Sequence, residues 1–123
     1  VPVISHLGFR CIVTDDRPEF STKDLFSQAE EVHTCDFDKI EGKAVFRSKA
    51  EGDKADIHGG TKTLKKLFIE EKIPAEKRSS VAVVSDDEGV LWVEGLGSAK
   101  RARLSEETVN VAAIKIRHKI KDF

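Results

Sequence analysis

The stretch from Gly59 to Gly97 constrains the fold most, because it predicts a helix, a break and a β-hairpin in unbroken succession. The apolar residues of the helix recur at i, i+3 and i+4, which is typical of one buried helical face: Leu64, Leu67 and Phe68. We expect the hydroxyl of Thr61 to cap the start of this helix. Pro74 should end it, since proline disfavours helical backbone at the residue before it.

Two strand-like runs follow, VAVVS and VLWVEG, joined by Asp-Asp-Glu-Gly with a glycine where a tight turn needs one. Trp92 in the second run could stack on a base, but its valine and leucine neighbours favour a place in the core. Ile69 interrupts the polar side of the helix, so it is either singly exposed or covered by the turn at Ile73 and Pro74.

Basic side chains accompany this stretch. Lys62, Lys65 and Lys66 are expected on the polar side of the helix, where a lysine face is ordinarily only solvated but can also contact phosphates. Gly59 and Gly60 just before it could admit an anion or form a flexible turn. A second basic segment follows the hairpin: Lys100, Arg101 and Arg103. The planar fork of arginine matches phosphate, which makes this segment a candidate contact.

The rest of the chain predicts short elements. Alternation before Thr14 indicates a strand, and residues 22–31 a short helix. Residues 32–37 and 43–48 are expected to pair as strands across the turn 38–42. The tail alternates isoleucine with lysine and arginine from Ile114 onward, which fits a charged edge strand as well as an RNA-binding one. Asp53 either orients Arg47 or another basic side chain toward RNA or caps backbone N–H groups of its own turn.

Length, charge distribution and cysteine content narrow the range of protein classes to which the chain can belong. A length of 123 residues suits one domain. Residues 1–56 carry 8 basic and 12 acidic residues (net −4), whereas residues 57–123 carry 13 basic and 10 acidic residues (net +3). The second part is therefore the better candidate for facing a polyanion. With no methionine and a start at Val1, the chain is expected to be a fragment of a larger protein. Two cysteines and no apolar run of about 20 residues predict a cytoplasmic protein without a membrane span or metal site.

Several motifs in order resemble the C-terminal domain of tRNA(Ile)-lysidine synthetases. They are the Gly59–Gly97 stretch itself, the upstream F-R-S-K with G-D-K (residues 46–49 and 52–54), and the closing Arg101 and Arg103 with S-E-E-T (105–108). The resemblance covers about residues 35–111. It implies an α+β fold, a small sheet sandwich with helices on one side. Composition and spacing alone indicate only the α+β class.

The resemblance also implies a function. It is that of the tRNA-binding domain of an enzyme that uses ATP and Mg²⁺ to join lysine to the anticodon cytidine, with the tRNA held at its acceptor end. The implied partners are tRNA and an N-terminal catalytic domain, with a homodimer left open. The family's S-G-G-x-D-S phosphate loop is absent here, so we expect no catalytic residue in this chain, and the segment between Gly52 and Gly59 is shorter than the family's.

We therefore predict a joining segment at residues 1–34 and a lysidine-synthetase C-terminal-like domain at 35–123. The predicted tRNA-binding residues are all basic: Arg47, Lys62, Lys65, Lys66, Arg78, Lys100, Arg101 and Arg103. Two alternatives stay open. The chain could be an interaction module that packs on its parent's other domains with little RNA contact, or, less in keeping with its lack of reactive motifs, a small independent enzyme.

Overall fold

A computed structural model describes residues 8–14 and 28–119. The chain divides into two compact units, one formed by Lys39–Arg103 and the other by Val1–Asp38 together with Leu104–Phe123. The second unit is thus built from one segment that precedes the first unit in the sequence and one that follows it. β2 runs through the boundary after residue 34 that the sequence suggested, and a join to another domain at residues 1–34 stays a prediction.

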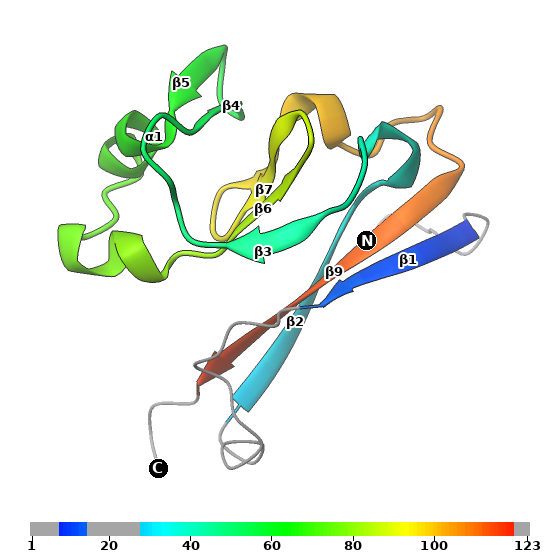
Figure 1. Cartoon of the computed structure of the whole chain (residues 1–123), viewed down its shortest axis with the longest axis horizontal. Coiled ribbons are helices and arrows are strands. Elements are labelled where there is room, and N and C mark those ends of the chain that lie inside the picture. The colour runs from blue at the N-terminus through cyan, green and yellow to red at the C-terminus, as the bar shows by residue number, and fades with distance from the viewer. Residues whose placement is uncertain (1–7, 15–27, 120–123) are drawn as a thin grey trace. The chain divides into compact units, whose positions relative to one another are not determined.

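The unit formed by the two outer segments holds a three-stranded sheet in the order β1-β9-β2 (Figure 1). β1 (Gly8–Thr14) runs parallel to β9 (Asn110–Lys119), and β2 (Gln28–Asp36) runs antiparallel to it. Cys35 faces Ala112 in the β2–β9 register, and both are buried, as are Val111, Ile114 and Ile116. β9 is therefore the central strand, flanked on both sides.

Three expectations for these segments are wrong. Gln28–Glu31 is strand rather than the end of a helix, because these residues pair with β9; the rest of the expected helix lies outside the described residues. The strand at 32–37 pairs with β9 and not with residues 43–48. The basic tail is not an edge strand, since β9 lies between two others. In each case a partner distant in sequence decides the pairing, which local patterns do not contain.

Polar side chains form hydrogen bonds where the chain leaves this unit after β2 and returns to it before β9. The carboxylate of Asp36 accepts a hydrogen bond from the hydroxyl of Thr108 (2.9 Å), and the Asn110 amide donates to Asp38 (3.0 Å). Asp36 and Thr108 are both about 5% exposed, so their hydrogen bond satisfies two buried polar groups. Phe37–Lys39 forms the short 3₁₀ helix η2 at the exit.

The Lys39–Arg103 unit contains a four-stranded sheet in the order β3-β6-β7-β8. β3 is Val45–Arg47, β6 Val83–Asp86, β7 Gly89–Val93 and β8 Gly97–Ser98. The predicted hairpin is confirmed as β6–β7, with Gly89 at φ 128° in its turn. Trp92 is 2% exposed, so its predicted place in the core is confirmed.

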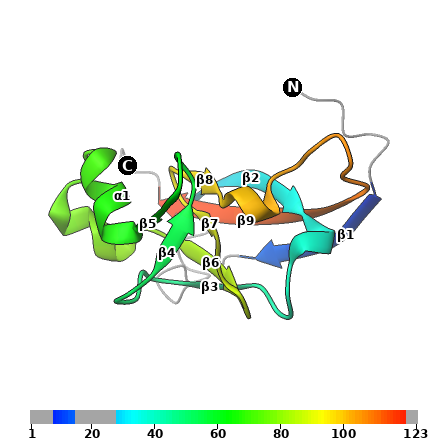
Figure 2. The same ribbon diagram turned by 90° about the horizontal axis from the view of Figure 1, so that it is seen from above.

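A second hairpin, β4 (Lys54–Asp56) with β5 (Thr61–Thr63), leads directly into α1 (Leu64–Glu70), as Figure 2 shows. The expected N-cap at Thr61 is wrong: the hydroxyl of Thr63 accepts the backbone N–H of Lys66 (3.2 Å). Thr61 pairs with Asp56 in the hairpin instead, so the helix begins only when strand pairing ends. Gly59 and Gly60 form the hairpin loop rather than the helix entrance.

The buried face of α1 is confirmed. Leu64, Leu67 and Phe68 are 0% exposed and share a core with residues of β4, β6 and β7 (Ala55, Val83, Val90 and Val93). Ile69 is 54% exposed, the first of its two expected placements. The predicted α+β class is confirmed, with sheets, one α-helix and short 3₁₀ helices among the described residues.

The C-terminus of α1 has a Schellman motif. The N–H of Ile73 donates to the carbonyl of Phe68, and the N–H of Lys72 donates to the carbonyl of Ile69. These bonds satisfy two carbonyl groups at the end of the helix that no regular helical hydrogen bond satisfies. Lys72 supplies the left-handed residue at φ 57°. Pro74 follows, and Ala75–Ser80 then forms the 3₁₀ helix η3 before the β6–β7 hairpin.

Candidate nucleic-acid interface

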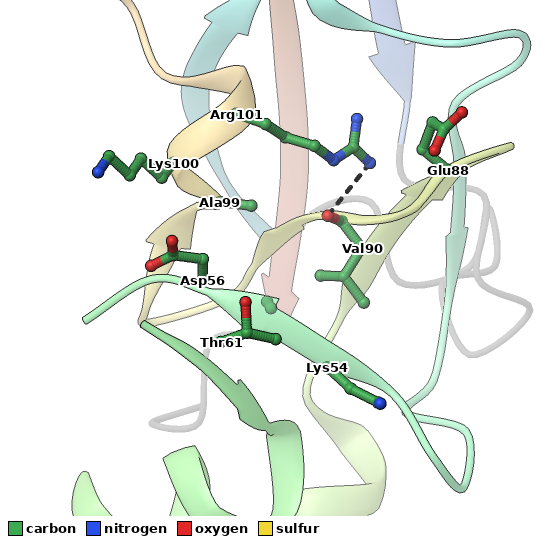
Figure 3. A pocket seen from close by; sticks show the side chains of 9 residues that line it. Lys54, Asp56, Thr61, Glu88, Val90, Ala99, Lys100 and Arg101 are labelled. Atoms are coloured by element: carbon green, nitrogen blue, oxygen red, sulfur yellow. Dashed lines mark hydrogen bonds between the residues drawn. The ribbon is translucent and has the colours of Figure 1, made fainter. Parts of the chain in front are cut away.

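The β4–β5 hairpin forms one wall of a hollow of about 370 Å³ in the Lys39–Arg103 unit, which we call the larger hollow. The opposite walls come from β7 and from η4 (Lys100–Ala102) (Figure 3). Its floor is small and aliphatic, with Val90 and Ala99. Its rim carries three basic and two acidic side chains and one hydroxyl: Lys54, Lys100, Arg101, Asp56, Glu88 and Thr61.

A smaller hollow of about 150 Å³ adjoins the same hairpin and is lined by Lys49, Lys65, Thr63 and the turn 50–53. Lys54 of the larger hollow pairs in register with Thr63 of the smaller one. The two hollows therefore lie on neighbouring residues of one hairpin. We call Lys49, Lys54, Lys65 and Lys100 the hairpin lysines.

The hairpin lysines are available to a ligand. Lys54, Lys65 and Lys100 are exposed and Lys49 is half-buried. None of the four ammonium groups has a hydrogen bond or ion pair with another described residue, and the same holds for the ammonium group of Lys66 on α1. An ammonium group on a flexible stem is a mobile point charge suited to phosphate oxygens. This arrangement can bind an extended anion by charge.

Lys62 differs from the other lysines. We expected it on the polar side of the helix with Lys65 and Lys66, and this is wrong because Lys62 lies in β5. Its ammonium group contacts both carboxylate oxygens of Glu70 at 3.0 Å. A phosphate would have to compete with that carboxylate.

Arg47 is held by Asp53. Its Nη1 and Nη2 donate to the two carboxylate oxygens at 2.7 and 3.0 Å, and its Nε to the hydroxyl of Ser85. Asp53 also accepts the backbone N–H of Ala50, which confirms the expected turn cap; that Asp53 orients Arg47 toward RNA stays a prediction. Burial alone would raise the pKa of Asp53; the Arg47 and Ala50 hydrogen bonds and the charges of Arg47 and Lys49 outweigh it, and the net pKa is lowered.

Arg101 forms the same kind of two-point contact with Asp86 (Nη2–Oδ1 2.7 Å). We call each of these arginine–carboxylate pairs a clamp. Burial again acts to raise the pKa of Asp86, but hydrogen bonds from Arg101 and from the backbone N–H groups of Glu41 and Glu88 lower it overall, as does the Arg101 charge. The other two predicted arginines bind backbone carbonyls, Arg78 that of Ile73 and Arg103 those of Ser98 and Ile57.

The predicted residues thus fall into two groups. Lys65, Lys66 and Lys100 are exposed, and their ammonium groups bind no described residue, whereas the side chains of Lys62 and the four predicted arginines bind protein acceptors. Whether any of them binds tRNA stays a prediction. Sequence reasoning missed Lys49 and Lys54. The pairing of β4 with β5 places Lys54 opposite Thr63, and the fold of the turn before β4 places Lys49 in one hollow with Lys65.

Other functional classes find less support in the described residues. No three of their histidine, cysteine, aspartate and glutamate side chains gather as a metal site would require. Cys35 is buried and forms no disulfide with another described residue. No helix in the described ranges is long and apolar enough to cross a membrane.

Comparison with known families identifies the domain. The sequence model described as the TilS substrate C-terminal domain matches residues 44–116, more than half of the chain. The chain belongs to this family. The TilS C-terminal domain is the C-terminal region of tRNA(Ile)-lysidine synthase, so the resemblance read from the sequence is confirmed.

Curated relatives support the TilS assignment. The chain is 34% identical over 117 residues to a tRNA(Ile)-lysidine synthase of Caldanaerobacter subterraneus subsp. tengcongensis, covering 93% of this chain and 24% of the relative. It is 37% identical over 79 residues to that of Clostridioides difficile (strain 630), covering 64% and 17%. The chain therefore spans about a quarter or less of the relatives it matches.

Solved structures agree on the fold. A crystal structure of a TilS C-terminal domain matches with a TM-score of 0.59 and 26% identity, over 74% of this chain and 72% of that one. An N-terminal fragment of the phenylalanyl-tRNA synthetase β-subunit from Pyrococcus horikoshii matches with a TM-score of 0.59 at 19% identity, over 79% of this chain and 30% of that one. The second likeness concerns the fold alone.

Proposed function

We propose that this TilS C-terminal domain binds the tRNA substrate of a tRNA(Ile)-lysidine synthase and holds its acceptor end. Lysine would be joined to the anticodon cytidine elsewhere in the same enzyme. The observation that carries the proposal is the set of hairpin lysines, which border two hollows without protein partners among the described residues. Several lysines on one hairpin and its neighbouring segments, with ammonium groups that bind no described residue, suit an external polyanion.

Duplex RNA fits these hollows better than stacked single-stranded bases. Phe68 and Trp92 of this unit are buried and Phe46 is half-buried, and none of the three lines either hollow, so neither hollow offers a stacking platform. Duplex RNA is recognised mainly through phosphates and 2′-hydroxyls. Lysines can meet the phosphates, and the carboxylates of Asp56 and Glu88 in the larger hollow can accept hydrogen bonds from ribose hydroxyls.

The parent enzyme's chemistry belongs to the same proposal. The catalytic domain that would bind ATP and Mg²⁺ is a further partner, and the cytoplasm is the compartment in which we expect the enzyme to act. A homodimer is left open. The alternative is a module that packs on its parent's other domains with little RNA contact.

Salt-dependent binding of a tRNA(Ile) transcript tests the proposal. Four phosphate contacts predict a log–log slope of about −3.6, or about a 150-fold loss of affinity between 50 and 200 mM salt. Replacing Lys54, Lys65 and Lys100 by alanine should reduce the slope by about 2.7. The fold should survive, because all three side chains are exposed.

A matched control removes the same charge elsewhere. Lys39, Lys43 and Lys77 are also exposed but line neither hollow, so their triple alanine variant should keep most of the wild-type slope. Equal losses in both triple variants would show binding by net charge without a site. Wild-type chain that binds no tRNA at 50 mM salt would favour the packing module.

A further inference from the structure

The guanidinium group of Arg101 has almost no donors left for a ligand. Nη1 donates to Asp86 Oδ2 (3.1 Å) and lies 3.5 Å from the Lys39 carbonyl oxygen. Nη2 donates to Asp86 Oδ1 (2.7 Å) and approaches the carbonyl oxygens of Gly89 and Val90 at 3.2 and 3.3 Å. The four N–H groups of the fork thus face five protein acceptors, and only Nε remains. A bidentate phosphate contact would require the clamp to open.

Asp86 connects this clamp to two further segments. Its side chain is 0% exposed and accepts the backbone N–H groups of Glu41 (2.8 Å), Glu88 (2.9 Å) and Gly89 (3.2 Å). Arg101 is therefore tied through one carboxylate to the β6–β7 turn and to the segment after η2. Figure 3 shows the Arg101 side chain reaching from η4 to Val90 in the wall of the larger hollow.

Arg103 ties the other end of η4 to the opposite wall. Its Nε donates to the Ser98 carbonyl (3.1 Å), and its Nη2 donates to the carbonyl of Ile57, the residue after β4. Lys100 begins η4, between the anchored hairpin on one side and the anchored β7 on the other. The two arginines set the separation of the walls that carry Lys54 and Lys100.

We propose that Arg101 and Arg103 are positioning residues, which hold the walls of the larger hollow so that Lys54 and Lys100 meet RNA phosphates. This inference rests on the proposed function and changes the role first expected for these arginines. In this proposal the two lysines contact the phosphates, and the two arginines hold the walls of the hollow in place.

Arg101→Lys tests the inference because it keeps the charge and removes the fork, which an ammonium group does not replace. The test compares tRNA(Ile) binding by the wild-type chain, Arg101→Lys, Lys100→Ala and the double variant, at a temperature where all four are folded. Lys100→Ala should lower the 50-to-200 mM affinity ratio by about 3.5-fold, the effect of one phosphate contact. Arg101→Lys should have a similar effect, and adding Lys100→Ala to it should change little further.

Other results would overturn the inference. If Arg101 contacts phosphate itself, Arg101→Lys should keep nearly the wild-type salt slope, and the two effects should add in the double variant. If Arg101 only stabilises the fold, Arg101→Lys should lower the melting temperature and leave affinity and slope unchanged.

An RNA-free measurement separates this inference from the proposed function. Arg101→Lys should speed hydrogen exchange at the amides of Glu41 and Glu88, which donate to Asp86, and Lys77→Ala should not. Unchanged exchange at both amides would contradict the clamp. Should exchange increase while the wild-type chain binds no tRNA, the clamp stands and the RNA-binding proposal fails. Arg103→Lys serves as the second variant if Arg101→Lys does not fold.

Discussion

Replacing Lys72 by glycine should raise the free energy of unfolding. Lys72 is held at φ 57° by the Schellman motif, and its exposed side chain has no hydrogen bond or ion pair with another described residue. The left-handed conformation costs a residue with a Cβ about 1–2 kcal/mol. Glycine avoids this cost but gains freedom in the unfolded chain that opposes it by about 0.4–1 kcal/mol. The net expectation is a gain of about 0.5–1 kcal/mol.

The neighbouring residue provides a matched control. Glu71 lies one position earlier at φ −84°, where glycine has no conformational advantage. Glu71→Gly should therefore lower the free energy of unfolding by about 0.5–1 kcal/mol. Its contact with His58 is exposed and should add only tenths of a kcal/mol. Urea denaturation should show midpoints shifting in opposite directions at an unchanged slope. Destabilisation by both substitutions would refute a left-handed Lys72.

Three further predictions concern the core, the clamps and catalysis. Phe68→Ala removes a fully buried ring and should cost about 3–5 kcal/mol in urea denaturation; a midpoint unchanged within error would contradict the packing of α1. The pKa values of Asp53 and Asp86 are lowered by folding, so their stabilising effect is present above the ordinary value of 3.8 and is lost as pH falls through the folded pKa. Denaturation from pH 6 to pH 2 should therefore show a weaker acid dependence in Asp86→Asn than in the wild type, and an equal dependence would count against the clamp. The chain alone should neither hydrolyse ATP nor form lysidine, and activity above that of a mock preparation would contradict this.

Sequence patterns within a short window correctly predicted the elements that neighbouring residues determine. The spacing of Leu64, Leu67 and Phe68 sufficed for the buried face of α1, and the turn residues before Gly89 sufficed for the β6–β7 hairpin. The β2–β9 pairing joins Cys35 to Ala112, which no short window contains. The N-cap was misplaced by two residues because Thr61 and Thr63 have the same capping chemistry, and only the hairpin with β4 distinguishes them.

The candidate site shows a similar division. Sequence reasoning named Lys65 and Lys100, which line the two hollows, but treated arginine as the better phosphate ligand. An arginine fork binds a protein carboxylate as readily as a phosphate. Asp53 lies six residues from Arg47 and Asp86 fifteen from Arg101, so only the folded chain shows that both forks are already occupied.

The position of Lys39–Arg103 between β2 and β9 has a consequence for the order of folding. During synthesis every residue of this unit leaves the ribosome before Asn110, the first residue of β9. β1 and β2 must then wait for the strand that pairs with both of them. If the 65-residue insertion (39 to 103) has already folded, β9 closes a shorter flexible loop onto β2, and the entropic cost of closure falls. A nascent chain that stops before Asn110 should therefore protect amides of α1 and β6–β7 while those of β2 still exchange.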